Sequence, residues 1–145
     1  MFRNKITVLL QFVKKVHNEH DISELNLGIN RTQTKILMLI NDNNEKSMSE
    51  ISSMTGLEKS SFTRSIDYLV DNRFVEKNFT ESDRRIIKLS LTKKGIKAAN
   101  LIKNDFDSYL DSLISDFSEE EKKDFFNSLN TVSEYLNKLL ERKKR

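Results

Sequence analysis

The sequence predicts a mainly α-helical protein with one small β-hairpin. Apolar residues recur at helical spacing along most of the 145 residues, and the chain holds three glycines and no proline, so interior helix breakers are few. Only two short runs, near residues 74–79 and 86–91, read as strands. With 37% hydrophobic and 32% charged residues, the composition is that of a helix-rich globular chain of one domain, or of two small lobes that share helices.

The first predicted helix runs from Lys5 to about His20. Its apolar residues Ile6, Leu9 and Val13 lie on one side. His17 and His20 lie one turn apart, a spacing at which two ligands can share a metal ion. Two histidines without a further ligand do not define a metal site, so we expect a solvated helix end and no metal or other cofactor.

The next helix is predicted to begin at a cap made by Asn30 and Gln33. Gly28 supplies the turn before it. The helix is strongly apolar, with Ile36, Leu37, Leu39 and Ile40. We therefore expect it to form the floor on which a later helix packs.

Residues 47–72 predict two short helices joined by a tight turn. Ser47 and Glu50 have the spacing of a capping box, which opens a helix that carries Met48, Ile51 and Met54 inward. Gly56 ends that helix, because glycine enters left-handed backbone freely. A second helix follows from about Glu58 to Asn72, with one apolar stripe of Phe62, Ile66, Leu69 and Val70.

The outer face of this second helix carries Lys59, Ser60, Thr63, Arg64 and Asp67, and Ser61 is a further candidate for DNA contact. Short donors near the first turns of a helix can reach base edges and phosphates in the major groove of DNA. We expect Arg64 to contact a base edge. An ordinary solvated face is the alternative, because charged outer faces are common.

The segment that follows favours DNA. The strand-like runs Phe74–Phe79 and Ile86–Leu91 flank a polar tip, residues 80–85, which carries Asp83, Arg84 and Arg85. Adjacent arginines on a hairpin tip can enter a minor groove, whose negative potential attracts arginine where the groove is narrow. Two helices, a tight turn and this hairpin together predict a winged helix-turn-helix over residues 30–95. We call residues 80–85 the wing tip.

Two more helices are predicted after the hairpin. Thr92 can cap a long helix to about Ile114, and Ser118 with Glu121 forms a capping box for the last one. The last helix has apolar residues at spacings of 4, 3, 4 and 3, which we call the carboxy-terminal seam: Phe125, Leu129, Val132, Leu136 and Leu139. We expect residues 1–29 and 96–145 to form a dimerisation region through this seam and the first helix, with packing inside one chain as the alternative.

The wing and its exit resemble those of the MarR family of bacterial transcription regulators, in the run Asp83-Arg84-Arg85-Ile86-Ile87-Lys88-Leu89-Ser90-Leu91-Thr92 followed by Lys93-Lys94-Gly95. Leu57-Glu58-Lys59-Ser60-Ser61-Phe62-Thr63-Arg64 is similar to the start of that family's recognition helix. The resemblance covers nearly the whole chain. This chain differs from the family in that its wing tip has neither glycine nor proline.

This resemblance implies a homodimeric repressor that binds a pseudo-palindromic operator in double-stranded DNA. It also implies a small-molecule effector pocket between the dimer helices and the DNA-binding region. Arg85 matches the family's arginine that enters the minor groove, and Asp83 matches the aspartate that supports the wing. The sequence does not name the effector or the operator.

Other functions are less favoured by the sequence. No cysteine is present, which excludes disulfides and thiol-based sensing, and no run approaches 18 apolar residues, so we expect a cytoplasmic protein without a membrane span. No phosphate loop, nucleophile elbow or zinc-helix motif indicates an enzyme. The net charge of +3 is small, so DNA affinity would depend on where the charges lie. The main rival is a winged helix that binds a protein partner and not DNA.

Overall fold

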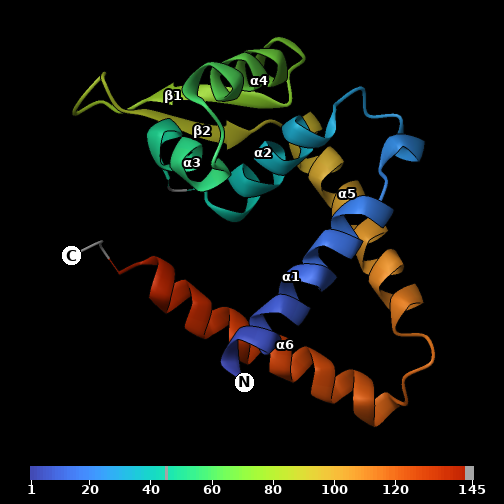
Figure 1. The fold of residues 1–145 in the computed structure, drawn as a ribbon. Coiled ribbons are helices and arrows are strands. Elements are labelled where there is room, and N and C mark those ends of the chain that lie inside the picture. Colours follow the sequence, from blue (N-terminus) through green and yellow to red (C-terminus); the bar gives the residue numbers. More distant parts are fainter. Residues whose placement is uncertain (45, 143–145) are drawn as a thin grey trace. The chain divides into compact units, whose positions relative to one another are not determined.

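The computed structural model describes residues 1–44 and 46–142, which fall into two compact units, residues 1–106 and residue 107 onward. The first unit holds α1 (Phe2–Glu19), a 3-10 turn (Ser23–Leu25), α2 (Arg31–Asp42), α3 (Met48–Thr55), α4 (Lys59–Asp71), β1 (Val75–Phe79) and β2 (Ile87–Leu91). The boundary between the units lies within α5 (Lys93–Leu113), and α6 (Glu119–Leu140) belongs to the second unit. The predicted mainly helical fold with one hairpin is confirmed (Figure 1).

Three helices begin at the capping boxes that the sequence predicts, at Asn30, Ser47 and Ser118. At the second box, the Ser47 amide donates to Glu50 Oε2 at 2.7 Å and the Glu50 amide donates to Ser47 Oγ at 3.2 Å. The hydrogen bond from the Ser47 amide is the main reason why the pKa of the Glu50 carboxyl lies below its usual range. Each box satisfies amide groups that would otherwise have no partner at a helix start.

The turn between α3 and α4 is made by Gly56, which has left-handed backbone with φ 67°. Helix α4 then buries Phe62, Ile66 and Leu69 against α2 and the hairpin. One expectation for this region is wrong: Met54 is 44% exposed and does not point into the core. Helix α3 has only 8 residues, and its buried side chains are Ile51 and Thr55.

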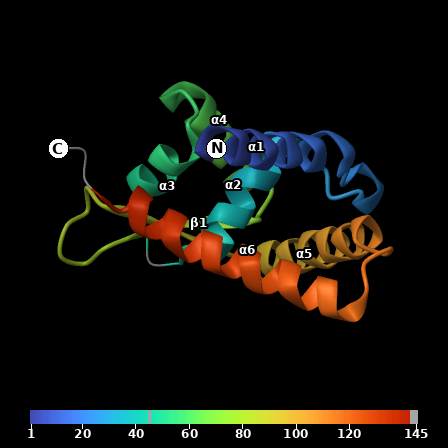
Figure 2. The ribbon, with the colours of Figure 1, turned by 60° about the horizontal axis from the view of Figure 1, so that its bottom comes forward.

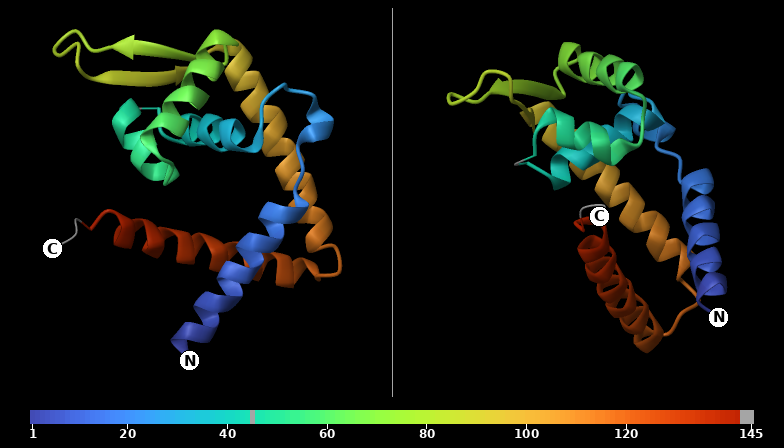
Figure 3. Two further views of the ribbon diagram at one scale, coloured as in Figure 1. Left: turned by 45° about the horizontal axis from the view of Figure 1, so that its top comes forward. Right: turned by 60° about the vertical axis from the view of Figure 1, so that its left-hand side comes forward.

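The hairpin is a two-stranded antiparallel sheet with Val75 opposite Leu91 and Phe79 opposite Ile87. An isolated bridge between Ser47 and Lys88 joins the start of α3 to β2. The strands leave the helices on one side, and their connecting loop projects beyond them, as both views of Figure 3 show. This arrangement is the predicted winged helix-turn-helix.

One cluster of buried side chains holds the first unit together. It combines residues from α2, α3, α4, the hairpin and the start of α5: Ile36, Leu37, Ile40, Ile51, Phe62, Ile66, Leu69, Phe74, Val75, Leu89, Ala98 and Ile102. The three residues from α2 are fully buried, so α2 is the floor that the sequence predicts. Helix α4 and the hairpin therefore share one core.

The start of α5 lies unusually close to the strand that precedes it. Thr92 Oγ1 accepts a hydrogen bond from the Gly95 amide at 3.1 Å, which caps the helix as predicted. A β-carbon on Gly95 would lie 2.0 Å from the Phe74 carbonyl oxygen, so only glycine fits there. Gly95 thus allows α5 to begin directly against the hairpin.

The second unit contains the end of α5 and the long helix α6, drawn in orange to red in Figure 2. The rings of Phe117 and Phe125 pack edge to face with centroids 6.1 Å apart. Four residues of the carboxy-terminal seam, Leu129, Val132, Leu136 and Leu139, are between 38% and 56% exposed. Helix α6 therefore presents an apolar stripe that is about half exposed.

Replacing Gly95 with alanine should destabilise the protein strongly. The added methyl group would overlap the Phe74 carbonyl oxygen, and overpacking of this kind typically costs about 1–3 kcal/mol. Denaturant unfolding measures the loss. Asn100→Ala, an exposed change in the same helix, is the control and should shift stability by less than about 0.5 kcal/mol. Equal stability of Gly95→Ala and the parent protein would contradict the close approach of Gly95 to the Phe74 carbonyl oxygen.

Candidate functional site

Helix α4 presents its polar side chains as the sequence predicts. Lys59, Ser60 and Arg64 are exposed, and Ser61 and Thr63 are half-buried. The Thr63 hydroxyl donates to the Lys59 carbonyl oxygen at 2.9 Å, one turn earlier in the same helix. The core face of α4 fixes this orientation, because Phe62, Ile66 and Leu69 point inward.

The polar side chains of α4 lie on two flanks of the helix. One flank faces the wing: Lys59 and Thr63 line an open groove of about 680 Å³ together with Arg85 and serines of α3. The other flank faces the start of α2: Ser61, Arg64, Ser65 and Tyr68 line a smaller recess of about 330 Å³ with Asn30, Thr32 and Gln33. The recognition helix therefore has a separate polar hollow on either side.

The wing tip is an ordered turn and not a continuation of the strands. Asp83 Oδ1 accepts a hydrogen bond from the Arg85 amide at 2.9 Å, and the Asp83 carbonyl oxygen accepts from Thr80 Oγ1 at 2.5 Å. The Arg85 side chain is 95% exposed, with Nε 3.7 Å from Asp83 Oδ1. Arg84 is exposed as well. Asp83 thus fixes the backbone from which both arginines project.

An ion pair joins the hairpin to the recognition helix. Lys77 Nζ on β1 lies 2.9 Å from Asp67 Oδ1 on α4. The pair is partly exposed, so its contribution to stability is small. It nevertheless neutralises a carboxylate on the outer half of α4, which makes that surface less negative.

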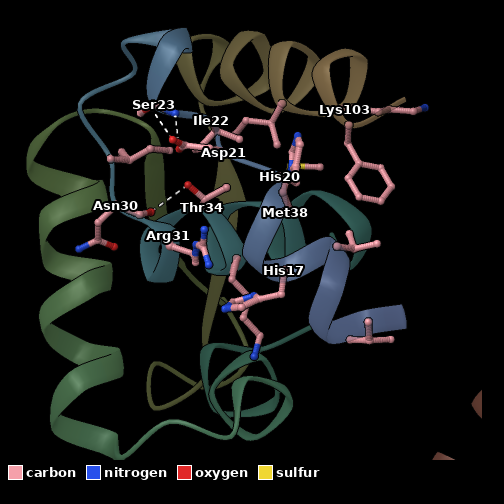
Figure 4. A pocket seen from close by; sticks show the side chains of 16 residues that line it. His17, His20, Asp21, Ile22, Ser23, Asn30, Arg31, Thr34, Met38 and Lys103 are labelled. Atoms are coloured by element: carbon pink, nitrogen blue, oxygen red, sulfur yellow. Dashed lines mark hydrogen bonds between the residues drawn. The ribbon is translucent and has the colours of Figure 1, made fainter. Parts of the chain in front are cut away.

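A mixed pocket of about 620 Å³ lies within the first unit, between the end of α1, the start of α2 and α5 (Figure 4). Its apolar side chains come from three helices and the segment after α1: Val13, Val16, Ile22, Ile29, Met38, Ile102 and Phe106. Its cationic side chains are Arg31, Lys35 and Lys103, and both histidines, His17 and His20, line it. Such a lining suits an apolar ligand with a polar or anionic group.

One carboxylate in the pocket lining, Asp21, and one beside the lining, Asp105, are already engaged. Asp105 Oδ2 lies 2.7 Å from His20 Nε2, and the His20 ring packs edge to face on Phe106 with centroids 5.2 Å apart. Asp21 accepts from the Ser23 amide and hydroxyl, both at 2.9 Å. The amide bond, and then the hydroxyl bond, hold the pKa of the exposed Asp21 carboxyl below its usual range.

The expectation of a solvated helix end is wrong for His20, because its side chain is only 14% exposed and lies against Asp105 and Phe106. Among residues 1–44 and 46–142, no group of three or more histidine, cysteine, aspartate or glutamate side chains is placed to hold a metal ion. The same residues include no helix with the length and apolar character needed to span a membrane.

The predicted dimerisation residues of α1 are also exposed. Ile6, Leu9 and Val13 are between 42% and 61% exposed, and α1 has no buried residue. The predicted residues of α6, Leu129, Val132, Leu136 and Leu139, have the exposures given above. Exposed apolar side chains of this kind are typical of a surface that binds another protein chain.

Comparison with known proteins identifies the family. The model of the MarR family matches residues 27–86, which span α2, α3, α4 and the wing tip. The helix-turn-helix transcriptional regulator BilQ of Clostridioides difficile is 30% identical over 98 residues, which cover 68% of this chain and 66% of BilQ. The chain belongs to the MarR family. It is therefore a helix-turn-helix transcription regulator, as the resemblance in its wing and recognition helix implies.

Solved structures of the family share the fold. A crystal structure of MarR superposes with a TM-score of 0.72 at 24% identity, covering 92% of this chain and 98% of MarR. Streptococcus pneumoniae FabT, solved in complex with DNA, superposes with a TM-score of 0.67 at 23% identity, covering 96% of this chain and 99% of FabT. The MarR-like fold thus extends over nearly the whole chain.

Sequence reasoning missed two features of the site. It did not identify the residues that line the pocket, because they come from positions 13 to 106 and only the fold brings them together. It also missed the second flank of α4. The spacing of Ser61, Ser65 and Tyr68, four and then three residues apart, was a usable signal of a second polar stripe.

Substitutions of Asp83 should separate its hydrogen bond from its charge. Asp83→Ala removes a negative charge but also the acceptor for the Arg85 amide, so we expect weaker DNA binding because a disordered wing tip loses entropy on docking. Asp83→Asn removes the same charge and keeps a carbonyl oxygen, so it should bind better than Asp83→Ala. Titrations at several salt concentrations test this. Tighter DNA binding by Asp83→Ala at every salt concentration would contradict the proposed support of the wing tip by Asp83.

Proposed function

We propose that this MarR-family regulator is a ligand-responsive repressor that binds a pseudo-palindromic operator as a homodimer in the cytoplasm. One observation carries the DNA-binding part of the proposal: Lys59 and Thr63 of α4 line the same groove as Arg85 of the wing tip. A recognition helix and an arginine-bearing wing that border one hollow can follow the surface of a duplex together. The solved DNA complex of FabT, a structural neighbour, supports the same use of the fold.

On DNA, the exposed face of α4 enters the major groove and the wing tip reaches the adjacent minor groove. Lys59, Ser60, Ser61, Thr63 and Arg64 are the contact residues on the helix. Arg85, whose side chain is 95% exposed, enters the minor groove, and the exposed Arg84 precedes it in the sequence. Asp83 keeps both arginines in position.

Dimerisation supplies the two-fold symmetry of the operator. The interface covers the exposed apolar residues of α1 and α6 with those of a second chain: Ile6, Leu9, Val13, Leu129, Val132, Leu136 and Leu139. The 4-3-4-3 spacing on α6 supports this, because a narrow stripe is typical of helix pairing. Two recognition helices then address successive half-sites of the DNA.

The effector binds in the 620 Å³ pocket near α2. Apolar side chains such as Met38, Ile102 and Phe106 would enclose its body, and Arg31 with Lys35 would attract an anionic group. The effector's identity does not follow from these residues. Ligand binding would lower DNA affinity if the ligand favours an arrangement of the helices that fits the operator poorly.

The alternative function is a winged-helix module that binds a protein partner. Selecting bound sequences from a pool of random duplexes separates the two. DNA binding predicts an enriched, two-fold symmetric motif and an affinity that falls steeply with salt. Enrichment of no motif, with an affinity independent of salt, would favour the protein-binding module.

Arg85→Ala should weaken operator binding most where the flank is A·T-rich. A narrow minor groove has an enhanced negative potential, and Arg85 is the more exposed partner of the Asp83 pair. The dependence of affinity on salt should flatten by about one charge per wing. Arg3→Ala, which removes an equal charge from α1, is the control. A uniform loss on every flanking sequence would contradict minor-groove insertion.

Leu136→Asp should break the homodimer. The substitution places a charge in an interface that excludes water, and an unpaired buried charge is costly. Sedimentation should then detect monomers, and cooperation between half-sites should be lost. Asn127→Asp adds the same charge to an exposed position outside the seam and should remain dimeric. An intact Leu136→Asp dimer would move the interface elsewhere.

A further inference from the structure

The flank of α4 that faces α2 has the chemistry of an anion site. Its recess combines side chains of α4 with the first turn of α2, and the lining carries one cation, Arg64. Among residues 1–44 and 46–142, the remaining lining side chains are hydroxyls and amides, with no carboxylate. A hollow with donors and one guanidinium, but without acidic groups, attracts an anion.

Some of these lining groups are already used by the fold. The Asn30 side chain accepts from the Gln33 amide and the Gln33 side chain accepts from the Asn30 amide, both at 2.8 Å. The Tyr68 hydroxyl donates to the Gly28 carbonyl oxygen at 2.5 Å. These bonds hold the walls of the recess in place and join α4 to the residues before α2.

The other lining groups are available. Within residues 1–44 and 46–142, the side chains of Thr32, Ser61, Arg64 and Ser65 make no hydrogen bond or ion pair. Arg64 is exposed, and the three hydroxyl residues are half-buried. Four unpaired donors therefore surround one hollow, with the charged donor at its outer side.

We propose that this recess binds a phosphate of the operator backbone, held by the Arg64 guanidinium and the hydroxyls of Thr32, Ser61 and Ser65. The inference rests on the proposed DNA-binding function. It assigns Arg64 to the DNA backbone, in place of the base contact that the sequence alone suggests. It also adds Thr32 and Ser65, which the sequence did not indicate.

The geometry of the major groove gives this assignment a physical reason. A helix inside the groove lies between two phosphate backbones, one along each flank. The flank with Lys59 and Thr63 faces the wing, and the flank with Arg64 faces α2. Each flank then meets one strand, and the recess fixes the position of α4 in the groove without reading the sequence.

The experiment compares Arg64→Ala with the parent protein on the operator obtained from random duplexes and on an unrelated duplex. A backbone contact predicts a similar loss on both, about tenfold, because a charge-assisted hydrogen bond is lost in either case. The slope of log affinity against log salt should fall by roughly 0.9 for each phosphate released. The sequence motif selected by Arg64→Ala should match the parent motif.

Alkylation of single phosphates locates the contact. In the parent protein, ethylation of one phosphate per half-site should block binding, and Arg64→Ala should no longer be sensitive to that phosphate. Ser65→Ala and Thr32→Val should weaken the same interference. Arg3→Ala, which removes a charge from α1, should leave it unchanged, and thermal unfolding verifies that each variant is folded.

Three results would overturn the proposal. Arg64→Ala could alter the selected motif at one base position with an unchanged salt slope, which would make Arg64 a base-reading residue. It could bind like the parent protein, which would leave the recess without a role in DNA binding. It could also lose affinity while Ser65→Ala and Thr32→Val keep the parent interference pattern, which would place the phosphate outside the recess. If the parent protein itself selects no DNA, the proposed function fails first and separately.

Discussion

The packing of α4 on α2 is the contact on which the rest of the DNA-facing surface depends. Phe62, Ile66 and Leu69 occupy one side of α4, and their burial against Ile36, Leu37 and Ile40 leaves a single orientation for the helix. Burial of six side chains of this size stabilises the lobe far more than any exposed ion pair can. The direction of every polar residue on α4 follows from it. The surface chemistry of the helix is thus set from the inside.

The wing is held on this same core by buried apolar side chains and a close backbone contact, more than by charged side chains. Phe74 and Val75 enter the core as the hairpin begins, and Leu89 returns to it from β2. Gly95 then lets α5 begin against the Phe74 carbonyl, and Thr92 caps the helix at that point. Recognition helix, wing and α5 therefore meet within a short stretch of chain. A tilt of the wing relative to α4 would disturb the core itself. The shared core therefore fixes the position of the hairpin relative to α4.

The sequence predicted the elements of this fold well because their signals are local. Capping pairs such as Ser47 and Glu50 determine where helices begin, and Gly56 determines where α3 ends. The prediction that Met54 points into the core is wrong. Helix α3 is so short that the turn at Gly56, and not helical periodicity, decides what its last residues contact. The sequence predicts a polar wing tip but not its turn, which forms because the Asp83 carboxylate accepts a hydrogen bond from the Arg85 amide. The linings of the pocket and the recess could not be read from the sequence, because only the fold brings α1, α2 and α5 together at the pocket, and α2 and α4 at the recess.

Helix α2 also links the pocket to the helix-turn-helix. Arg31, Lys35 and Met38 face the pocket, and Ile36, Leu37 and Ile40 face the core, so the two surfaces belong to one rigid element. Lys35 makes the link more direct, because its Nζ donates to the carbonyl oxygen of Thr55 at 3.1 Å. Thr55 is the last residue of α3 and precedes the turn at Gly56. An anion bound in the pocket would attract the same ammonium group that donates to that carbonyl oxygen. If the anion draws Lys35 away from Thr55, the turn between α3 and α4 loses a hydrogen bond, and by linkage DNA binding that requires this bond would disfavour the ligand to the same degree.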